Sequence, residues 1–236
     1  MYKANKRLQD VFAHAAALQQ NGRLRNTIYC YKQYIYILNQ DDTVLIRFHL
    51  RPSEVSFSHP IAFHANDYDS GMFYEEDGCI HFVVENEGYK RIKRCGSPEY
   101  TPKYIHKLFC QKTEKVSEKN QVDVEESLIE LLDESLTHIE FSAKQGNLKI
   151  VQRNIYTGSL ISIGAKEQKG GLLCPAELKD FKPIGMRTRD FLALFSFTPR
   201  VSLCFGNPDF VWCENKDRKT PYKGIIGLCK YDELRG

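Results

Sequence analysis

Residues 186–216, MRTRDFLALFSFTPRVSLCFGNPDFVWCENK, decide the fold that we expect for this chain. The stretch reads as a short helix, a proline turn, a strand, an Asn-Pro turn and a second strand. A stretch of similar shape, FHANDYDSGMFYEEDGCIHFVVENEGYKRIK, begins at Phe63. Two stretches built on one plan indicate a duplicated domain, and a function that lies in the assembly rather than in a catalytic pocket.

Signals for helix ends and strands occur in both stretches. Asn66 and Thr188 are the expected N-caps, because short polar side chains accept hydrogen bonds from the unpaired N–H groups of a first helical turn. Each short helix is expected to close at a phenylalanine, Phe73 or Phe195. The strands that follow have matching alternating positions, which are Ile80, Phe82, Val201 and Leu203.

A further helix is predicted upstream of each stretch. LQDVFAHAAALQQ (residues 8–20) and LIELLDESL (residues 128–136) carry apolar residues at helical spacing. A shift of about 120 residues suits a duplicated domain better than a short solenoid repeat. Three pairs of apolar positions align at this shift: Leu8 with Leu128, Val11 with Leu131, and Phe12 with Leu132.

Hairpins are predicted after both of these helices. TIYCYKQYIYILNQDDTVLIRFHL contains two β-rich runs about a turn at residues 39–42. THIEFSAKQGNLKIVQRN contains two more about Gln145-Gly146-Asn147, and YTGSLISIG supplies a third strand. Each half of the chain therefore reads as helix, strands, short helix, strands.

The segment between the halves is predicted to be an extended connector. CGSPEYTPKYIHKLFCQKTEKVSEKNQVD (residues 95–123) has two early prolines and a charged, polar end. We place the boundary near Ser117, which gives domains of residues 1–116 and 117–236.

Composition excludes several classes of protein. The 236 residues are 42% hydrophobic and 27% charged, with a net charge of +3, which is ordinary for a globular protein and too weak to identify a nucleic-acid binder. No apolar run approaches the roughly 20 residues of a membrane span, and no signal-peptide core follows the N-terminus. None of the eight cysteines forms a C-x-x-C pair. We therefore expect a reducing, intracellular compartment, no membrane association, no metal site and no cofactor.

The order and spacing of these elements resemble those of DNA sliding clamps, of the proliferating cell nuclear antigen and T-even-like phage types. The likeness rests on IAFHANDYDSGMF before GCIHFVV and on MRTRDFLALF before RVSLCF, and it covers nearly the whole chain. It implies an α+β fold of duplicated clamp domains, each with two helices packed on antiparallel sheets. It also implies a non-enzymatic, homotrimeric ring that encircles duplex DNA, holds the replicative polymerase without reading sequence, and is placed by a clamp loader.

The resemblance puts helices on the DNA side of the ring, so basic residues near them are candidate phosphate contacts. The alternative is ordinary solvated surface charge. The candidate DNA-binding residues are Lys6, Arg7, Lys144, Lys149, Arg187 and Arg189.

In the resembling clamps, the connector and the C-terminal segment receive short peptides from polymerases. The alternative is that the apolar residues here only pin the connector to a sheet. The candidate partner-binding residues are Tyr104, Ile105, Leu108, Phe109, Ile225 and Leu228.

One feature departs from the clamp pattern. The predicted helix DVEESLIELLDESL, residues 123–136, has acidic residues and no Lys or Arg, so it would repel phosphates. Either basic residues such as Lys144 and Lys149 shield it, or it lies away from DNA. A monomeric processivity factor of the same fold, holding DNA by a basic face, therefore stays open.

Two other functions remain as alternatives. The residues His64, Asp67 and Asp69 suggest a metal-dependent hydrolase, although their spacing matches no metal motif and Asn66 and Asp67 suit a helix start. A scaffold of two β-rich domains without a DNA role is the other. Trp212 is interpreted as a packing residue.

Overall fold

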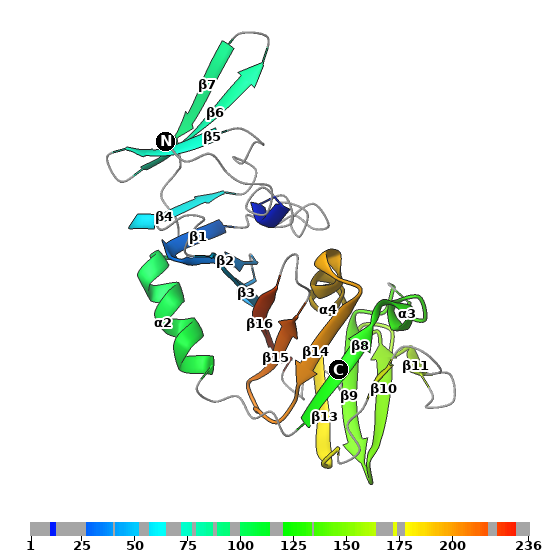
Figure 1. The fold of residues 1–236 in the computed structure, drawn as a ribbon. Helices are drawn as coiled ribbons and strands as arrows, with labels where there is room; N and C mark the ends of the chain where they lie inside the picture. The colour runs from blue at the N-terminus through cyan, green and yellow to red at the C-terminus, as the bar shows by residue number, and fades with distance from the viewer. Residues whose placement is uncertain are drawn as a thin grey trace. The chain divides into compact units, whose positions relative to one another are not determined.

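The structure, a computed structural model, divides the chain into two compact units. One unit is Met1–Glu114 with Asp217–Tyr222, and the other is Lys115–Lys216 with Lys223–Gly236 (Figure 1). The structure describes residues 10–12, 27–39, 41–51, 57–64, 72–76, 79–86, 89–94, 100–113, 120–133, 135–163, 172–173, 178–216 and 221–229.

The first unit is built from antiparallel strands in the orders β3-β2-β1-β4 and β5-β6-β7. Aromatic and β-branched residues dominate these strands, as their preference for pleated surfaces predicts. The strands are β1 (Thr27–Lys32), β2 (Tyr34–Leu38), β3 (Val44–His49), β4 (Phe57–His64), β5 (Met72–Glu76), β6 (Cys79–Asn86) and β7 (Tyr89–Arg94).

The first predicted hairpin contains one more turn than the sequence indicated. Residue Lys32 has a φ of 54°, and the chain reverses there between β1 and β2. The predicted turn at residues 39–42 is confirmed between β2 and β3, where Asn39 Oδ1 accepts the N–H groups of Thr43 and Val44, both at 2.8 Å. Tyr29, Tyr36 and Phe48 are fully buried in this unit.

The prediction of an extended connector is wrong. Residues Pro102–Thr113 form the helix α2, which contacts β1 and β4. Pro102 occupies the first helical position, where its missing N–H costs nothing, and Thr101 Oγ1 accepts the N–H of Tyr104 at 3.2 Å. Ile105 and Phe109, four residues apart on one face, are buried. Burial of this apolar pair stabilises the helix, whereas the neighbouring prolines had indicated an extended chain.

The second unit contains strands in the orders β12-β8-β14-β15-β16 and β11-β10-β9-β13. Phe141 packs against Phe191 and Phe205, with ring centroids 5.6 Å and 5.3 Å apart, and so joins the sheet to the helix α4 (Thr188–Ala193). The strands are β8 (Gln121–Glu125), β9 (His138–Lys144), β10 (Asn147–Arg153), β11 (Leu160–Ile163), β12 (Leu172–Leu173), β13 (Phe181–Arg187), β14 (Arg200–Cys204), β15 (Phe210–Asn215) and β16 (Tyr222–Gly227).

The predicted acidic helix at residues 123–136 is also wrong. Its first residues belong to β8, and only Glu126–Ile129 form a helix, α3. The strand is favoured because Val122 and Val124 alternate into the core while Asp123 pairs across to β14. Like charges at i,i+4 spacing further weaken a continuous helix here.

Hydrogen bonds hold Asp123 in the strand. Ser202 donates to Asp123 Oδ1 at 2.5 Å and Arg200 donates to Oδ2 at 2.8 Å. Burial alone would raise the pKa of this carboxyl, but the hydrogen bonds from Ser202, Arg200 and Gln121 outweigh burial and lower it.

The predicted helix signals have mixed outcomes. Phe73 lies in strand β5 and closes no helix, because the residues around it alternate in a ladder with β6. Thr188 is the first residue of α4 rather than its N-cap, which is Arg187 and makes no side-chain cap bond. Phe195 lies in the 3-10 turn η3 (Leu194–Phe197) that follows α4. Asn66 lies outside the described residues.

Other predictions are confirmed. Gln145 and Gly146 form the turn between β9 and β10, with φ of 52° and 75°. The third strand is β11, and the expected strand positions Ile80, Phe82, Val201 and Leu203 lie in β6 and β14. Trp212 is buried. Of the helix predicted at residues 8–20, residues 10–12 are described and are helical. No helix in the described part of the chain is long and apolar enough to cross a membrane.

Candidate docking site and basic surface

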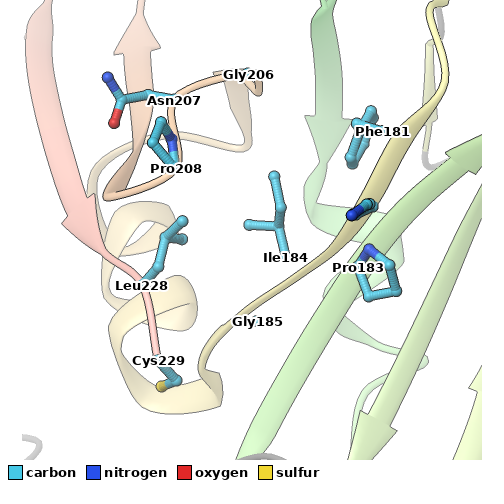
Figure 2. A pocket seen from close by; sticks show the side chains of 10 residues that line it. Phe181, Pro183, Ile184, Gly185, Gly206, Asn207, Pro208, Leu228 and Cys229 are labelled. Atoms are coloured by element: carbon cyan, nitrogen blue, oxygen red, sulfur yellow. The ribbon is translucent and has the colours of Figure 1, made fainter. Parts of the chain in front are cut away.

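The second unit has a hollow of about 370 Å³ beside the end of β16 (Figure 2). Its wall comes from three separate parts of the chain: β13, the turn after β14, and the residues after β16. Figure 2 shows the side chains of Ile184 and Leu228 below the turn that carries Asn207 and Pro208. The lining residues are Phe181, Lys182, Pro183, Ile184, Gly185, Gly206, Asn207, Pro208, Leu228 and Cys229.

Main-chain hydrogen bonds bring these three segments together. The N–H of Cys229 donates to the carbonyl of Gly185 at 3.0 Å, and the N–H of Leu228 donates to the carbonyl of Asp209 at 3.3 Å. The residues after β16 are thus tied to β13 on one side and to the turn on the other. Leu228 is thereby fixed in the wall of the hollow.

The turn and the strand each have a local reason for their shape. Gly206 has a φ of 130°, a conformation that other residues rarely adopt, and Asn207 Oδ1 accepts the N–H of Asp209 at 2.9 Å. The pairing of β13 with β9 shifts between Phe181 and Ile184. Pro183 lies within this shift, where a residue without an N–H is tolerated.

The hollow suits an apolar side chain. Its back wall is rigid, because the ring of Phe181 stacks on that of Phe205 with centroids 4.9 Å apart. Pro183, Ile184, Pro208 and Leu228 are further apolar lining residues, and Lys182, which also lines the hollow, is exposed. Binding sites of this type take an apolar anchor and are oriented by a few polar groups.

The predicted partner-binding residues separate into two groups. Leu228 lines the hollow, whereas Ile225 is buried in β16. The four connector residues lie on α2, in the first unit. Of these, Ile105 and Phe109 face inward and are buried, as the pinning alternative expects, while Tyr104 is 52% exposed.

A cluster of aromatic and basic side chains holds α2 on its sheet. The hydroxyl of Tyr36 lies 2.5 Å from Nδ1 of His106, and Cys110 Sγ lies 3.8 Å from Nε2. The guanidinium of Arg47 lies 4.4 Å from the centre of the Phe109 ring and 4.8 Å from that of Tyr34. These contacts surround the inner face of the helix.

The protonation of this cluster follows from burial and charge. Burial, and then the positive charges of Lys32 and Arg47, lower the pKa of His106. Burial raises the pKa of Tyr36, although Arg47 opposes that effect. The favoured arrangement is therefore a neutral imidazole whose Nδ1 accepts a hydrogen bond from the protonated Tyr36 hydroxyl.

The predicted DNA-binding residues do not form one compact patch. Arg187 ends β13 and Arg189 lies on α4, where its Nε is 3.8 Å from Asp190 Oδ1. Lys144 and Lys149 lie at the other end of the sheet, beside the β9–β10 turn. Arg187 pairs with His138, the first residue of β9, and Lys144 is its last. The seven residues of β9 span about 20 Å, which is the separation of the two groups. Lys6 and Arg7 lie outside the described residues.

Solved structures of sliding clamps match this chain over nearly its whole length. The PCNA2–PCNA3 complex of Sulfolobus tokodaii matches with a TM-score of 0.59 and 14% identity, covering 93% of this chain and 96% of that one. The proliferating cell nuclear antigen of Entamoeba histolytica gives 0.56 and 10%, covering 94% and 96%. The beta clamp of Helicobacter pylori, solved with 3,4-difluorobenzamide, gives 0.64 and 15%, covering 98% of this chain and 65% of that one.

The chain has the sliding-clamp fold. The resemblance inferred from the sequence is thus confirmed for the fold, as is the α+β class with antiparallel sheets. These matches do not single out the phage type. No protein-family model and no curated protein sequence matches. The structural comparison therefore identifies the fold where comparison of whole sequences finds no relative.

The hydrolase alternative was based on His64, Asp67 and Asp69, of which the structure describes only His64. His64 ends β4, and Asp67 and Asp69 lie outside the described residues. No group of three or more His, Cys, Asp or Glu side chains in the described ranges could hold a metal ion.

Most of the hollow was missed from the sequence. Only Leu228 had been singled out, because the wall joins residues more than 40 positions apart, such as Ile184 and Leu228. The dipeptide Asn207-Pro208 was interpreted only as a turn. A glycine directly before it, as at Gly206, was the one local signal of an unusual backbone.

Proposed function

We propose that this protein is a DNA polymerase processivity factor: a non-enzymatic, intracellular sliding clamp that encircles duplex DNA and needs no cofactor. The observation that carries the proposal is the sliding-clamp fold, which extends over 93–98% of the chain in the three comparisons. A ring retains DNA by topology, so it needs neither a catalytic group nor contacts to base edges.

Assembly into a homotrimeric ring is supported by the edge of one sheet. β11 ends the order β11-β10-β9-β13, and no strand pairs with its outer edge in the described part of the chain. Leu160 and Ile161 on this strand are 54% and 42% exposed, and Tyr156 just before it is 83% exposed. An unpaired edge with exposed apolar side chains is suited to pairing with another copy.

The hollow in the second unit is proposed to take an apolar anchor of the replicative polymerase, and of the clamp loader in turn. Leu228 is the predicted partner-binding residue that lines it, and the exposed lining residue Lys182 offers a charge to the residues that flank the anchor. Residues Tyr104 and Leu108 remain proposed contacts on α2.

DNA contact is proposed for the basic residues as mobile, screened contacts to phosphates. Arg187 and Arg189 form one proposed group and Lys144 and Lys149 another, because the sheet separates them. Such contacts carry no sequence preference, as sliding requires.

The test combines mass in solution with retention on DNA. Light scattering over a range of concentrations should give a trimer, and trimers assembled on nicked circular DNA should stay bound after a high-salt wash. Linearising the same DNA should release them, because a ring slides off an end. If the high-salt wash removed the protein from circular and linear DNA to the same extent, the topological mechanism would be wrong.

A monomeric processivity factor of the same fold is the second candidate. It is favoured by the acidic side chains of Glu125, Glu126 and Glu130, in and beside α3. These side chains would repel the phosphates of DNA enclosed by a ring. This candidate predicts a monomer at every concentration, with salt-sensitive binding to linear DNA that needs no loader.

A further inference from the structure

We propose that the exposed face of α2 binds an acidic segment of the protein that the clamp holds on DNA. We call this the lysine face, defined as Lys103, Tyr104, Lys107 and Gln111, all exposed. The inference rests on the proposed function, because it concerns a partner of the clamp. It goes further by stating the charge and spacing of the partner segment.

The lysine face lies on one side of the helix. Residues 103, 107 and 111 recur every four positions, which places them in a row along an α-helix. The opposite face carries the buried residues Ile105 and Phe109. The helix is therefore held from one side and presents its lysines from the other.

The charge of α2 has one sign. Its sequence, PKYIHKLFCQKT, contains Lys103, Lys107 and Lys112 and no Asp or Glu. Neither Lys103 nor Lys107 has an ion-pair partner among the described residues. Two adjacent, uncompensated cations on a rigid surface are complementary to a pair of carboxylates.

The position of Lys103 argues against a purely structural origin of this charge. It lies in the first turn, where the helix dipole favours acidic residues and disfavours a cation. Asp or Glu at this position would stabilise the helix more than Lys does. Lys103 thus departs, on the exposed face, from the preference of a first helical turn for acidic residues, and such departures are typical of binding sites.

The spacing defines the partner segment. Side chains four residues apart on a helix have Cβ atoms about 5–6 Å apart. Alternate residues of an extended chain lie about 6.6 Å apart, with their side chains on the same face. An extended segment with acidic residues at every second position therefore fits Lys103 and Lys107.

An aromatic platform flanks the two lysines. The ring of Tyr104 stacks on that of Tyr100, with centroids 5.6 Å apart and planes at 24°. Tyr100 in turn donates its hydroxyl to Asp42 Oδ2 at 2.6 Å. The platform offers an apolar contact to a partner side chain that lies beside the acidic residues, on the same face of the extended segment.

A protein segment fits this face better than nucleic acid does. Asp42 and its neighbour Asp41 are exposed at the platform end and would repel a phosphate chain. A nucleic-acid strand carries a negative charge about every 3.4 Å, and two lysines neutralise little of it. A short acidic segment can end before it reaches the two aspartates.

The experiment measures fluorescence anisotropy of a labelled peptide, Glu-Thr-Glu-Tyr-Glu-Thr, titrated with the full chain at low salt. Its Gln-Thr-Gln-Tyr-Gln-Thr counterpart controls for the carboxylates, and a labelled 12-nucleotide oligo-dT reports nucleic-acid binding. The test variant is K103E/K107E. The control is K179E/K216E, which reverses two other exposed lysines and changes the net charge equally.

We expect the Glu peptide to bind at least tenfold more weakly to K103E/K107E, and within twofold of wild type to K179E/K216E. The Gln peptide should bind weakly to all three proteins. Equal losses in both variants, or equal binding of both peptides by wild type, would overturn the proposal. A larger loss of oligo-dT than of peptide would assign the face to nucleic acid instead.

Folding and assembly are checked on the same proteins. Glu at position 103 suits the helix dipole, so K103E/K107E should keep the wild-type melting temperature and mass in solution. If wild type neither assembles nor stays on circular DNA, the proposed function fails whatever the peptide does. If it does both but shows no preference for the Glu peptide, only the inference about α2 fails.

Discussion

Replacing Phe109 with alanine should release α2 from its sheet while the strands of the first unit stay folded. Phe109 is fully buried, its ring centroid lies 5.7 Å from that of Tyr36, and the guanidinium of Arg47 lies 4.4 Å from its centre. Deleting a buried phenylalanine ring costs about 3–5 kcal/mol. Burial of Ile105 and Phe109 together contributes about 3–6 kcal/mol, so the substitution removes most of what holds the helix.

Native-state hydrogen exchange with mass spectrometry measures this release directly. In Phe109→Ala, amides of residues 102–113 should exchange at rates close to those of an unstructured peptide. Amides of β1, β2 and β3 should keep their protection, because their hydrogen bonds lie within their own ladder. Leu108→Ala is the matched control: this neighbour is half-buried, and its truncation should cost about 1 kcal/mol or less.

Two results would refute the reasoning. If α2 in Phe109→Ala stays as protected as in wild type, the pair of buried apolar side chains is not what holds it. If β1 to β3 lose protection to the same extent as α2, the helix and the strands unfold as one unit and α2 is not a separately docked element.

Three further outcomes are expected. Because the pKa of His106 is lowered in the folded state, the unfolded state binds a proton first as the pH falls below about 6.5, and the folded state loses stability toward acid. Between pH 7.5 and pH 5.5, the free energy of unfolding measured in urea should therefore fall less for His106→Phe than for wild type. Leu228→Asp should weaken capture of the cognate polymerase at least tenfold, or ~1.4 kcal/mol, without changing the mass in solution. Leu131→Asp, at a site that is already 48% exposed, should leave capture unchanged. Gly146→Val should cost about 1–2 kcal/mol of unfolding free energy in urea titrations, because φ is 75° there, and a cost near zero would contradict the turn geometry.

Local signals predicted local structure well. The Gln145-Gly146 turn was evident because few residues other than glycine tolerate a positive φ, and β9 and β10 alternate clearly on either side of it. The clamp fold followed from the order of such elements along the chain. It did not require knowledge of any contact between distant residues.

Helical periodicity failed where another interaction overrode it. Leu128, Leu131 and Leu132 suggested a long helix, but Asp123 is held in β8 by hydrogen bonds across to β14, and the helix ends at Ile129. In the connector the error was the opposite one. The prolines suggested an extended chain, and the buried pair on α2 became evident only with the sheet beneath it.

The candidate sites were the least predictable part. The hollow depends on main-chain hydrogen bonds between Cys229 and Gly185 and between Leu228 and Asp209. No pattern in the sequence predicts such long-range pairs. The basic residues could be identified from the sequence. Their separation by the length of β9 could not, because it depends on the register of β13 against β9.

The differing burial of the cysteines offers a route to spectroscopy. Burial raises the pKa of Cys213, and Cys30 and Cys204 are also buried, so these thiols react slowly with alkylating dyes. Cys110 and Cys229 are only half-buried. With the remaining cysteines replaced by serine, a maleimide dye at Cys229 would report on a ligand entering the hollow, and one at Cys110 would report on the release of α2. The chain thus carries its own attachment points for a fluorescent reporter, one in the wall of the hollow and one between α2 and its sheet.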